Sequence, residues 1–430
     1  MVAPRRAEMT IPWAPDDLGW TRRAGFVYSR RLMPGPLAGV RILDVTTVVL
    51  GPWATQTLGD LGADVIKVEP PEGDTTRRLG PARHPGMAAF FLACNRNKRS
   101  VVLDLKQDAG RAALLRLAGT ADAMLHNFRP EPAARLGLDY ETFRAVNPRL
   151  VYCGTYGFRA RGPYGNKPAY DDVIQAASGL AALQASITGE PRYMPTIVAD
   201  KTSSLTVLSS VLAGLFERER SGKGQAIEVP MMEAVVAYVM VEHLYGETFI
   251  PSLESAGYKR ILNRWRRPFE TKDGHLAVVP YTDAHWRTFF QIAGRPDLQD
   301  DPRFTTLESR LANIEVLYEE LGKIVATRTS AEWLQALERA SVPATVVNTL
   351  ESLLSDPQLE ATGFWKVVEH PSEGTLRMPD IPATYSRTPG DIRRLQPRLG
   401  EHSVEVLREA GFSPREIDGM LASGATAQAT

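Results

Sequence analysis

The sequence predicts an α/β fold: a large domain on a doubly wound parallel sheet of the Rossmann-like type, with a smaller α+β domain. Apolar strand-like runs alternate with helical patterns from residue 40 to about residue 240. The first strand, helix and strand fit within about thirty residues, as a βαβ unit with parallel strands requires. Near residue 250 the alternation stops. The length of 430 residues suits two domains.

The elements of the first domain follow from the hydrophobic pattern. Residues 40–45 form a buried apolar run, Gly51-Pro52 opens a helix with proline in its first turn, and Gly62 ends that helix. The same reasoning predicts strands at 65–69, 100–105, 123–126, 150–155 and 225–229. It predicts helices at 108–119, 132–136, 140–146, 170–183, 203–217 and from 231 onward.

The second domain begins with a β-hairpin, because Asp273-Gly274 separates two β-rich runs within 267–279. Helices are predicted at 283–293, 307–327 and 330–340, strands at 344–347 and 364–368, and closing helices at 403–409 and 414–422.

These elements divide the chain into four parts. We expect an N-terminal extension at 1–35, a linker at 236–249 and a small domain at 250–344. The large domain is then discontinuous, with parts at 36–235 and 345–430.

Composition excludes several classes of partner and location. Lys and Arg together number 50, as do Asp and Glu, so the formal net charge is zero and neither nucleic acid nor a membrane surface is an expected partner. Only Cys94 and Cys153 are present, which argues against a disulfide framework and for a reduced, cytoplasmic location. No apolar stretch approaches the ~18 residues of a membrane span, and the N-terminus lacks the apolar centre of a signal peptide. Without CxxC or HExxH spacing, no metal site is expected.

The first βα turn argues against a bound dinucleotide. Residues 46–52 lack the GxGxxG spacing that lets a backbone approach pyrophosphate, and neither a P-loop nor a GxSxG motif is present.

Three segments stand out as candidate sites for chemistry. Cations crowd 95–106 and could hold phosphates, although a solvated loop gives the same pattern. Residues 126–130 follow a strand at the sheet edge where open α/β folds bind ligands, and Asn and Phe there could contact adenine. Residues 162–179 combine a Gly-Pro turn with an acidic helix start, which a plain turn and N-cap would also explain.

Asp200 stands where an irregular stretch, 195–199, meets the helix predicted at 203–217. Aspartate is a favoured N-cap, and the helix dipole stabilises a negative charge there. A carboxylate that stays ionised at neutral pH could attack an activated acyl group. The alternative is that Asp200 only caps the helix, because caps far outnumber nucleophiles.

Taken together, these segments resemble the class III coenzyme A transferases, the family of formyl-CoA transferase and carnitine CoA-transferase. The likeness runs from about residue 36 to the end, and the order and spacing of its motifs are more specific than any one of them. The matching motifs are 36–44, 51–52, 62–69, 97–100, 127–130, 147–150, 162–164, 175–179, 221–225 and 399–402.

The resemblance implies a mechanism. In this family an aspartate opening a helix attacks the acyl-CoA thioester, and Asp200 falls at that place. A mixed anhydride forms, an aspartyl-CoA thioester follows and frees the donor acid, and an acceptor carboxylate reverses the sequence. Coenzyme A is then a substrate, and no cofactor is bound permanently. The resemblance also implies an interlocked homodimer of two ring-like chains.

The resemblance further implies contacts with coenzyme A. Positions that match the adenine and phosphate region are Leu103, Lys106, Asn127, Phe128 and Arg135. Tyr170 and Asp171 match positions close to the reacting thioester. The glycine-rich loop of formyl-CoA transferase has no counterpart near 255–270, which argues against formyl transfer to oxalate. The basic cluster 264–267 could hold an acceptor carboxylate or form a solvated turn.

Two other functions stay open. An α-methylacyl-CoA racemase shares this fold and moves a proton with a His and an Asp, but Tyr170 stands where that histidine would precede Asp171. A CoA-binding protein without activity would need no nucleophile, and it is favoured if Asp200 points into solvent.

Overall fold

The computed structural model describes residues 35–429. The predicted N-terminal extension, 1–35, therefore lies outside the described residues except for its last position. The described chain forms two compact units. The first contains 35–168, 200–231 and 363–429, and the second contains 169–199 and 232–362. The domain boundaries expected from the sequence stay a prediction.

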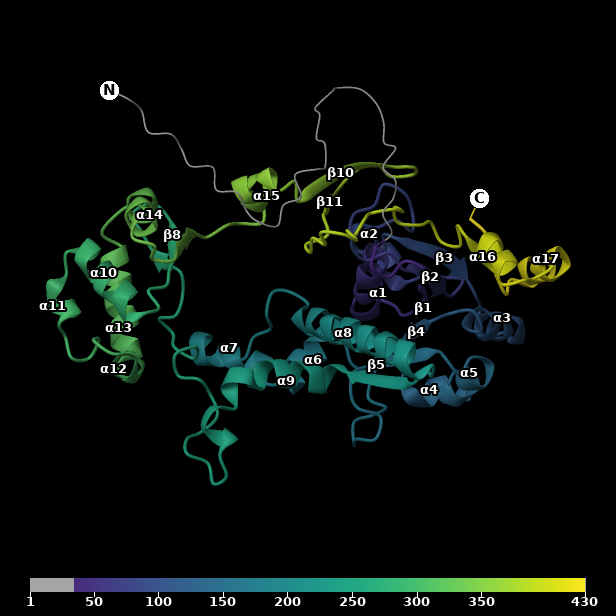
Figure 1. Ribbon diagram of the computed structural model, residues 1–430, viewed down its shortest axis with the longest axis horizontal. Coiled ribbons are helices and arrows are strands. Elements are labelled where there is room, and N and C mark those ends of the chain that lie inside the picture. Colours follow the sequence, from purple (N-terminus) through teal and green to yellow (C-terminus); the bar gives the residue numbers. More distant parts are fainter. Residues whose placement is uncertain (1–34, 430) are drawn as a thin grey trace. The chain divides into compact units, whose positions relative to one another are not determined.

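The first unit is built on a six-stranded parallel sheet, which confirms the predicted doubly wound α/β fold (Figure 1). Its strands are β1 (Arg41–Val45), β2 (Asp64–Glu69), β3 (Lys98–Val102), β4 (Ala123–His126), β5 (Val151–Tyr156) and β6 (Ala226–Pro230). Their order in the sheet is β3-β2-β1-β4-β5-β6. The order reverses between β1 and β4, and at such a switch point open α/β sheets bind ligands at the carboxyl ends of their strands.

Helices connect the strands of this sheet and cover its apolar faces. They are α1 (Leu50–Asp60), η1 (Thr75–Arg78), α2 (Ala89–Cys94), α3 (Asp108–Ala118), α4 (Pro130–Arg135) and α5 (Tyr140–Val146). Leu114 and Leu117 of α3 and Phe143 of α5 are buried in one core with Leu43 of β1 and Met124 of β4. This packing holds the carboxyl ends of the strands in place.

The C-terminal segment closes the outer edge of β3. It contains the hairpin β10 (Trp365–His370) and β11 (Gly374–Pro379), followed by α16 (Ser403–Glu409) and α17 (Pro414–Ser423). Ser403 Oγ accepts a hydrogen bond from Val102 N at 3.0 Å, and the Thr426 hydroxyl donates to Val102 O at 2.6 Å. The backbone N–H of His402 also donates to Ser100 O at 2.9 Å. An edge strand with unpaired backbone groups would otherwise be open to pairing with another chain.

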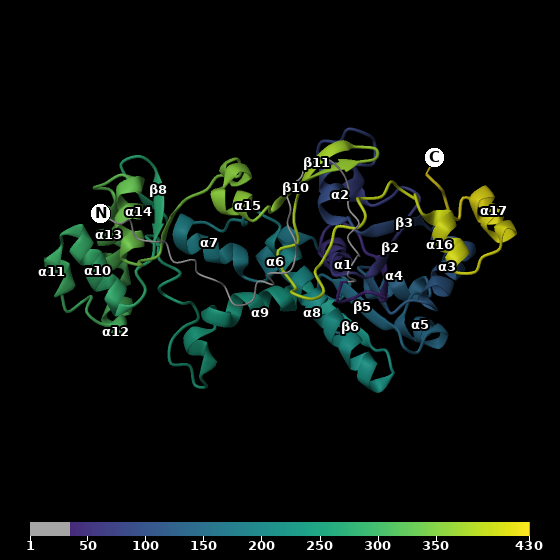
Figure 2. The same ribbon diagram turned by 45° about the horizontal axis from the view of Figure 1, so that its top comes forward.

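The second unit has its own core around an antiparallel sheet ordered β7-β8-β9, whose strands are β7 (Phe269–Glu270), β8 (His275–Val278) and β9 (Ala344–Val346). The helices are α6 (Asp171–Ala177), α7 (Leu180–Thr188), η2 (Tyr245–Thr248), α10 (Asp283–Ala293), α11 (Pro296–Gln299), α12 (Leu307–Ala312), α13 (Ile314–Val325), α14 (Ser330–Arg339), η3 (Ser352–Ser355) and α15 (Pro357–Ala361). Figure 2 shows α10, α13 and α14 grouped beside β8. Trp333 stacks on Phe289 with 5.7 Å between ring centroids, and both rings are fully buried.

Two predicted helices are each divided in the structure. The one predicted at 170–183 breaks at Ser178, because Gly179 has a φ of 85°, a left-handed conformation that suits glycine and ends a helix. The one predicted at 307–327 breaks at Asn313, which separates α12 from α13.

Helices α8 (Val198–Ser221) and α9 (Met231–His243) complete the structure. The predicted start of α8 at Ser203 is wrong, since the helix begins five residues earlier. Asp200 therefore lies within its first turn and does not occupy the N-cap. Among the helices of the described chain, none combines the length and apolar character needed to cross a membrane.

Candidate active site

The turn between β1 and α1 is the most strained segment at the carboxyl edge of the sheet. Val48 has a φ of 72°, in the left-handed region that β-branched residues rarely adopt. Its backbone N–H donates to Asp74 Oδ1 at 3.3 Å, and Lys67 Nζ donates to Thr46 O at 3.0 Å. Such a conformation persists only where the surroundings over-determine it, and strain of this kind gathers at functional sites.

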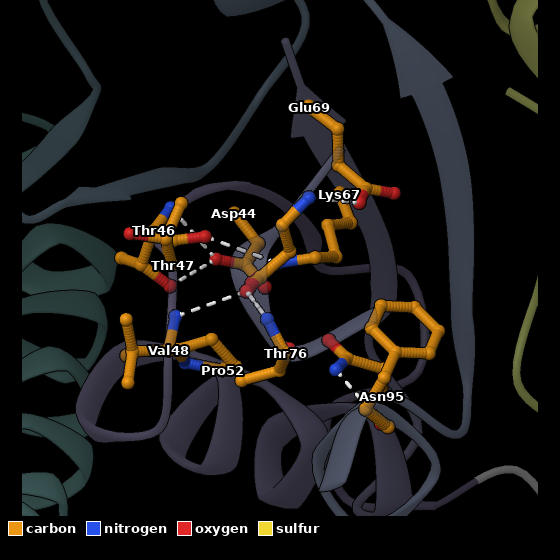
Figure 3. A network of polar contacts seen from close by, with 12 residues as sticks. Asp44, Thr46, Thr47, Val48, Pro52, Lys67, Glu69, Thr76 and Asn95 are labelled. Carbon is orange, nitrogen blue, oxygen red and sulfur yellow. Dashed lines mark hydrogen bonds and ion pairs between the residues drawn. The ribbon is translucent and has the colours of Figure 1, made fainter. Parts of the chain in front are cut away.

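A buried network of charges supports that turn (Figure 3). Lys98 Nζ lies 2.8 Å from Asp44 Oδ2, Lys67 Nζ lies 3.0 Å from Asp74 Oδ2, and none of these four side chains is exposed to solvent. Asp44 also accepts hydrogen bonds from the hydroxyls of Thr46 and Thr55. Figure 3 shows Asp44 and Lys67 beside the turn that carries Thr46, Thr47 and Val48. Because every charge has a partner, the desolvation cost of burying it is offset.

Electrostatics keeps the carboxylates of this network ionised. Burial raises the pKa of Asp44, but the charges of Lys98 and Lys67 outweigh it and hold that pKa far below its usual range. Burial likewise opposes the ionised form of Lys67, yet Asp44 and Asp74 raise its pKa above the usual value. Burial lowers the pKa of Lys98 to about 8, against the attraction of Asp44.

Asn127, predicted to contact adenine, holds the first βα turn from the neighbouring strand end. Its carboxamide accepts a hydrogen bond from Thr47 N at 3.2 Å and donates one to Thr47 O at 3.0 Å. This two-point contact joins the segment after β4 to the turn after β1 across the switch point. The side chain therefore has a structural role in addition to the ligand contact that the sequence predicts.

We expect Asn127→Ala to lower the free energy of unfolding by about 1–3 kcal/mol, because it leaves two partly buried backbone groups of Thr47 without partners. Urea titration measures the change. Asn166→Ala, at an exposed position, is the matched control and should stay within about 0.5 kcal/mol of wild type. An Asn127→Ala protein as stable as the control would show that this contact does not hold the turn.

His126 and Phe128 stand on either side of Asn127. Phe128 is half-buried against the core, and its ring stacks on His126 with 5.7 Å between centroids. His126 is 3% exposed, and neither ring nitrogen has a hydrogen-bond partner among the described residues. It lines a cavity of about 240 Å³ together with Tyr152 and Glu228.

Burial lowers the pKa of His126 to about 4, so we expect this imidazole to stay neutral from pH 5 to 8. Between pH 6.5 and about pH 4, His126 is protonated in the unfolded chain and neutral in the folded chain. The free energy of unfolding therefore decreases as the pH falls through this range. NMR titration of the ring carbon signal, assigned by its loss in His126→Phe, measures this pKa. A midpoint near 6.5 would contradict the expectation.

The other predicted coenzyme A contacts differ in exposure. Leu103 directly follows β3 and is buried in the core, while Lys106 is exposed three residues further on. Arg135, the last residue of α4, is exposed and lies 3.3 Å from Glu131. Leu103, Lys106 and Phe128 thus follow strands whose carboxyl ends share one edge of the sheet, and Arg135 lies at the far end of the helix that follows β4.

Asp200, the predicted nucleophile, is 9% exposed in the first turn of α8. The negative charge of the Asp200 carboxylate affects the pKa of the Cys94 thiol at the end of α2. Burial raises the pKa of that thiol to about 11, and the charge of Asp200 adds to the effect. A thiol with so high a pKa is protonated at neutral pH and is therefore a poor nucleophile. Asp200 stands in the part of α8 that belongs to the first unit.

Tyr170 and Asp171 belong to the second unit. Tyr170 is 72% exposed at the N-cap of α6, and Asp171 is 6% exposed in the first turn of that helix. Asp171 accepts a hydrogen bond from Gln175 Nε2 at 2.6 Å. Within the described residues, no group of three or more His, Cys, Asp or Glu side chains is arranged to hold a metal ion.

The sequence reasoning missed the buried charges beneath the first βα turn. A signal was present, because Asp44 and Lys67 each stand between two apolar residues of a strand, and a fully buried charge needs a partner. The pairing of Asp44 with Lys98 could not be found without the sheet order β3-β2-β1, and that of Lys67 with Asp74 depends on the path of the loop after β2.

Comparison with known proteins agrees with this geometry. A family model described as CoA-transferase family III matches residues 37–403. Succinate–glutarate CoA-transferase of Agrobacterium fabrum is 35% identical over 391 residues, which cover 87% of this chain and 95% of that protein. Acetyl-CoA:oxalate CoA-transferase of Acetobacter aceti is 34% identical over 384 residues, covering 87% and 96%.

Solved structures show the same fold. A CAIB/BAIF family protein from Brucella suis is 31% identical with a TM-score of 0.74, covering 88% of this chain and 100% of that one. Rv3272 from Mycobacterium tuberculosis is 32% identical with a TM-score of 0.75, covering 86% and 99%. The fold and the comparisons together define a CoA-transferase enzyme. The chain belongs to CoA-transferase family III.

Proposed function

We propose that this enzyme moves coenzyme A from an acyl-CoA donor to a carboxylic acid, with the carboxylate of Asp200 as the nucleophile. The observation that carries the proposal is the burial of Asp200 in the first turn of the 24-residue helix α8. A buried carboxylate is less solvated and hence more reactive, and exclusion of water protects an anhydride from hydrolysis. Backbone N–H groups of the first helical turn are suited to stabilise the oxyanion.

The first half of the reaction loads coenzyme A onto the enzyme. An oxygen of Asp200 attacks the acyl carbonyl carbon, the C–S bond breaks, and the CoA thiolate leaves a mixed anhydride. The thiolate then attacks the aspartyl carbonyl carbon. The C–O bond to the donor breaks, the donor acid departs with one oxygen from Asp200, and an aspartyl-CoA thioester remains.

The second half runs in reverse with the acceptor. Its carboxylate attacks the aspartyl carbonyl and expels the thiolate, which then attacks the carbonyl carbon of the acceptor. The acceptor leaves as its CoA thioester, and Asp200 is regenerated with one oxygen from the acceptor. Neither the anhydride nor the thioester is hydrolysed, so the reaction needs no ATP.

The first unit offers the groups that coenzyme A requires. We assign Lys106 and Arg135 to its phosphates, and Asn127 and Phe128 to its adenine, with Leu103 beside them. These residues follow strands whose carboxyl ends share one edge of the sheet, where such ligands bind. Tyr170 and Asp171 are assigned to the thioester end of the ligand. We further propose that the enzyme works as an interlocked homodimer.

The names of the relatives indicate which pairs of acyl-CoA and acid to test as substrates. These names include succinate, glutarate and oxalate, so short dicarboxylates and their CoA thioesters are the first substrates to test. A racemase reaction would instead need an acid and a base on either side of the α-carbon. The side chain next to Asp171 is the phenol of Tyr170, which has no imidazole nitrogen to serve that role.

Trapping separates the three functions considered. The enzyme is incubated with succinyl-CoA, treated with hydroxylamine and digested, and the peptide that carries residue 200 is weighed. Conversion of Asp200 to its hydroxamate supports the transferase. Loss of deuterium from the α-carbon of a 2-methylacyl-CoA without an adduct supports a racemase, and binding of CoA with neither result supports a non-catalytic protein.

A further inference from the structure

The second unit contains a pocket whose charges are not neutralised by the protein. It has a volume of about 300 Å³, and three of its lining residues are Arg260, Arg266 and Arg267. No Asp or Glu lines it. Within the described part of the chain, none of these three guanidinium groups has a carboxylate within ion-pair distance. In a chain with equal numbers of acidic and basic residues, three uncompensated cations around one pocket indicate an anionic ligand.

A second arginine-lined pocket of this protein also contains three carboxylates, Asp64, Glu405 and Glu409. Arg99 lines a pocket in the first unit, and its guanidinium lies 2.7 Å from Asp64, 2.8 Å from Glu405 and 2.9 Å from Glu409. There the protein itself supplies carboxylates for Arg99 and Arg41, whereas Arg393, which lines the same pocket, donates to the backbone oxygens of Gly59 and Ala63. The pocket of the second unit lacks such partners, so a ligand with a carboxylate would complete it.

The floor of the pocket is apolar. Phe269, Val278, Trp286 and Tyr318 are each at most 7% exposed and belong to the core of the second unit. The floor is therefore fixed by packing and does not depend on a ligand for its shape. Apolar surface at the base with cations at the rim suits a molecule that has an anionic head and an apolar body.

One of the cations is held in place by an aromatic ring. The guanidinium carbon of Arg267 lies 5.3 Å from the ring centroid of Trp265, a cation–π distance. Arg264 lies at the same distance from that ring but forms an ion pair with Glu315 at 3.4 Å, and it is not part of the pocket lining. Arg264 is thus a neighbouring arginine that already has a carboxylate partner.

We propose that this pocket binds a free carboxylic acid, with its carboxylate on Arg266 and Arg267 and its apolar body on the Val278 and Trp286 floor. A volume of about 300 Å³ lies at the lower end of the range of small-molecule sites, so a compact acid such as octanoate is a suitable probe. The site lies within the second unit and needs no covalent chemistry. Its occupancy is therefore independent of transfer at Asp200.

The test measures binding of octanoate to the full-length protein by calorimetry, with Trp fluorescence as a second signal. Octanoate should bind, and 1-octanol and acetate should each bind about tenfold more weakly or worse, because one lacks the charge and the other lacks the apolar body. Arg266→Gln/Arg267→Gln should weaken octanoate binding about tenfold or more. Arg264→Gln, the matched control, should stay within about twofold, because its charge is already paired.

Two further variants secure the interpretation. Ala277→Phe fills the pocket and leaves the arginines in place, so it should also weaken octanoate binding about tenfold, and it replaces the double variant if that one does not fold. Asp200→Asn should bind octanoate as wild type does, which separates this site from the transfer reaction. Equal affinity for octanoate and octanol, unchanged binding in both pocket variants, or displacement of octanoate by free coenzyme A would overturn the proposal. Displacement by coenzyme A would indicate that the arginines bind its phosphate groups.

Discussion

Asp200→Asn should lower the rate of CoA transfer by a factor on the order of 10⁴ or more, while CoA affinity changes only a few-fold. Removing the nucleophile of a covalent mechanism eliminates the bond on which both intermediates depend, and effects of this size are typical for such residues. Asparagine keeps the shape of the side chain, so the helix start and the CoA contacts assigned after β3 and β4 are preserved. The measurement is transfer between succinyl-CoA and glutarate by mass spectrometry, with CoA binding by calorimetry.

Glu217→Gln provides the control for that variant. Glu217 lies on the same helix at an exposed position, so its loss removes a carboxylate of α8 without touching the buried first turn. Its transfer rate should stay within about twofold of wild type. Substantial transfer by Asp200→Asn, with Glu217→Gln unchanged, would refute the assigned nucleophile and leave the fold assignment intact.

Asp44→Asn should lower the free energy of unfolding by about 3–5 kcal/mol, because removing one member of a buried ion pair leaves its partner charged and unpaired. Lys98 Nζ, fully buried, would lose the carboxylate that lies 2.8 Å away. Urea titration at pH 7 measures the change. Glu141→Gln breaks an exposed pair with Arg144 and should cost less than about 1 kcal/mol. A loss for Asp44→Asn no larger than that of the control would contradict the role given to the network.

The pH dependence of stability gives the same network a distinct signature. The pKa of Asp44 is lowered in the folded state, so its contribution is fully present above the unfolded value near 3.9 and is lost as pH falls through the folded value. Wild type should therefore lose stability below about pH 4 more steeply than Asp44→Asn. Lys98 acts in the opposite sense: its folded pKa of about 8 lies below the unfolded value, so the cost of burying its charge diminishes as pH rises above 8.

Much of the fold follows from the sequence because its elements have strong local signals. The strand β4 and the helices α5, α10 and α16 have the predicted bounds, and at α5 and α10 a capping side chain, Asp139 or Thr282, marks the start. The elements α2, α11 and β11 were not predicted. The early start of α8 was missed because residues 195–199 contain a proline, three β-branched residues and a single strong helix former, Ala199.

The candidate site was less accessible to sequence reasoning than the fold. Asn127 and Phe128 could be singled out because they follow a strand, but the contact of Asn127 with Thr47 depends on strands 80 residues apart becoming neighbours. Asp44 and Lys67 likewise depend on strand order. Arg266 and Arg267 were visible only as part of the basic cluster 264–267, since a sequence cannot show which cations lack a carboxylate among the described residues.

Oxygen transfer tests the covalent role of Asp200 most directly. The enzyme is given succinyl-CoA and glutarate labelled with ¹⁸O in both carboxylates, allowed about one turnover, and digested for mass spectrometry. The proposed sequence returns one acceptor oxygen to the enzyme, so the peptide that carries residue 200 should gain a single ¹⁸O, and no other peptide should change. Formation of glutaryl-CoA with no label in that peptide would show that coenzyme A reaches the acceptor without a bond to Asp200.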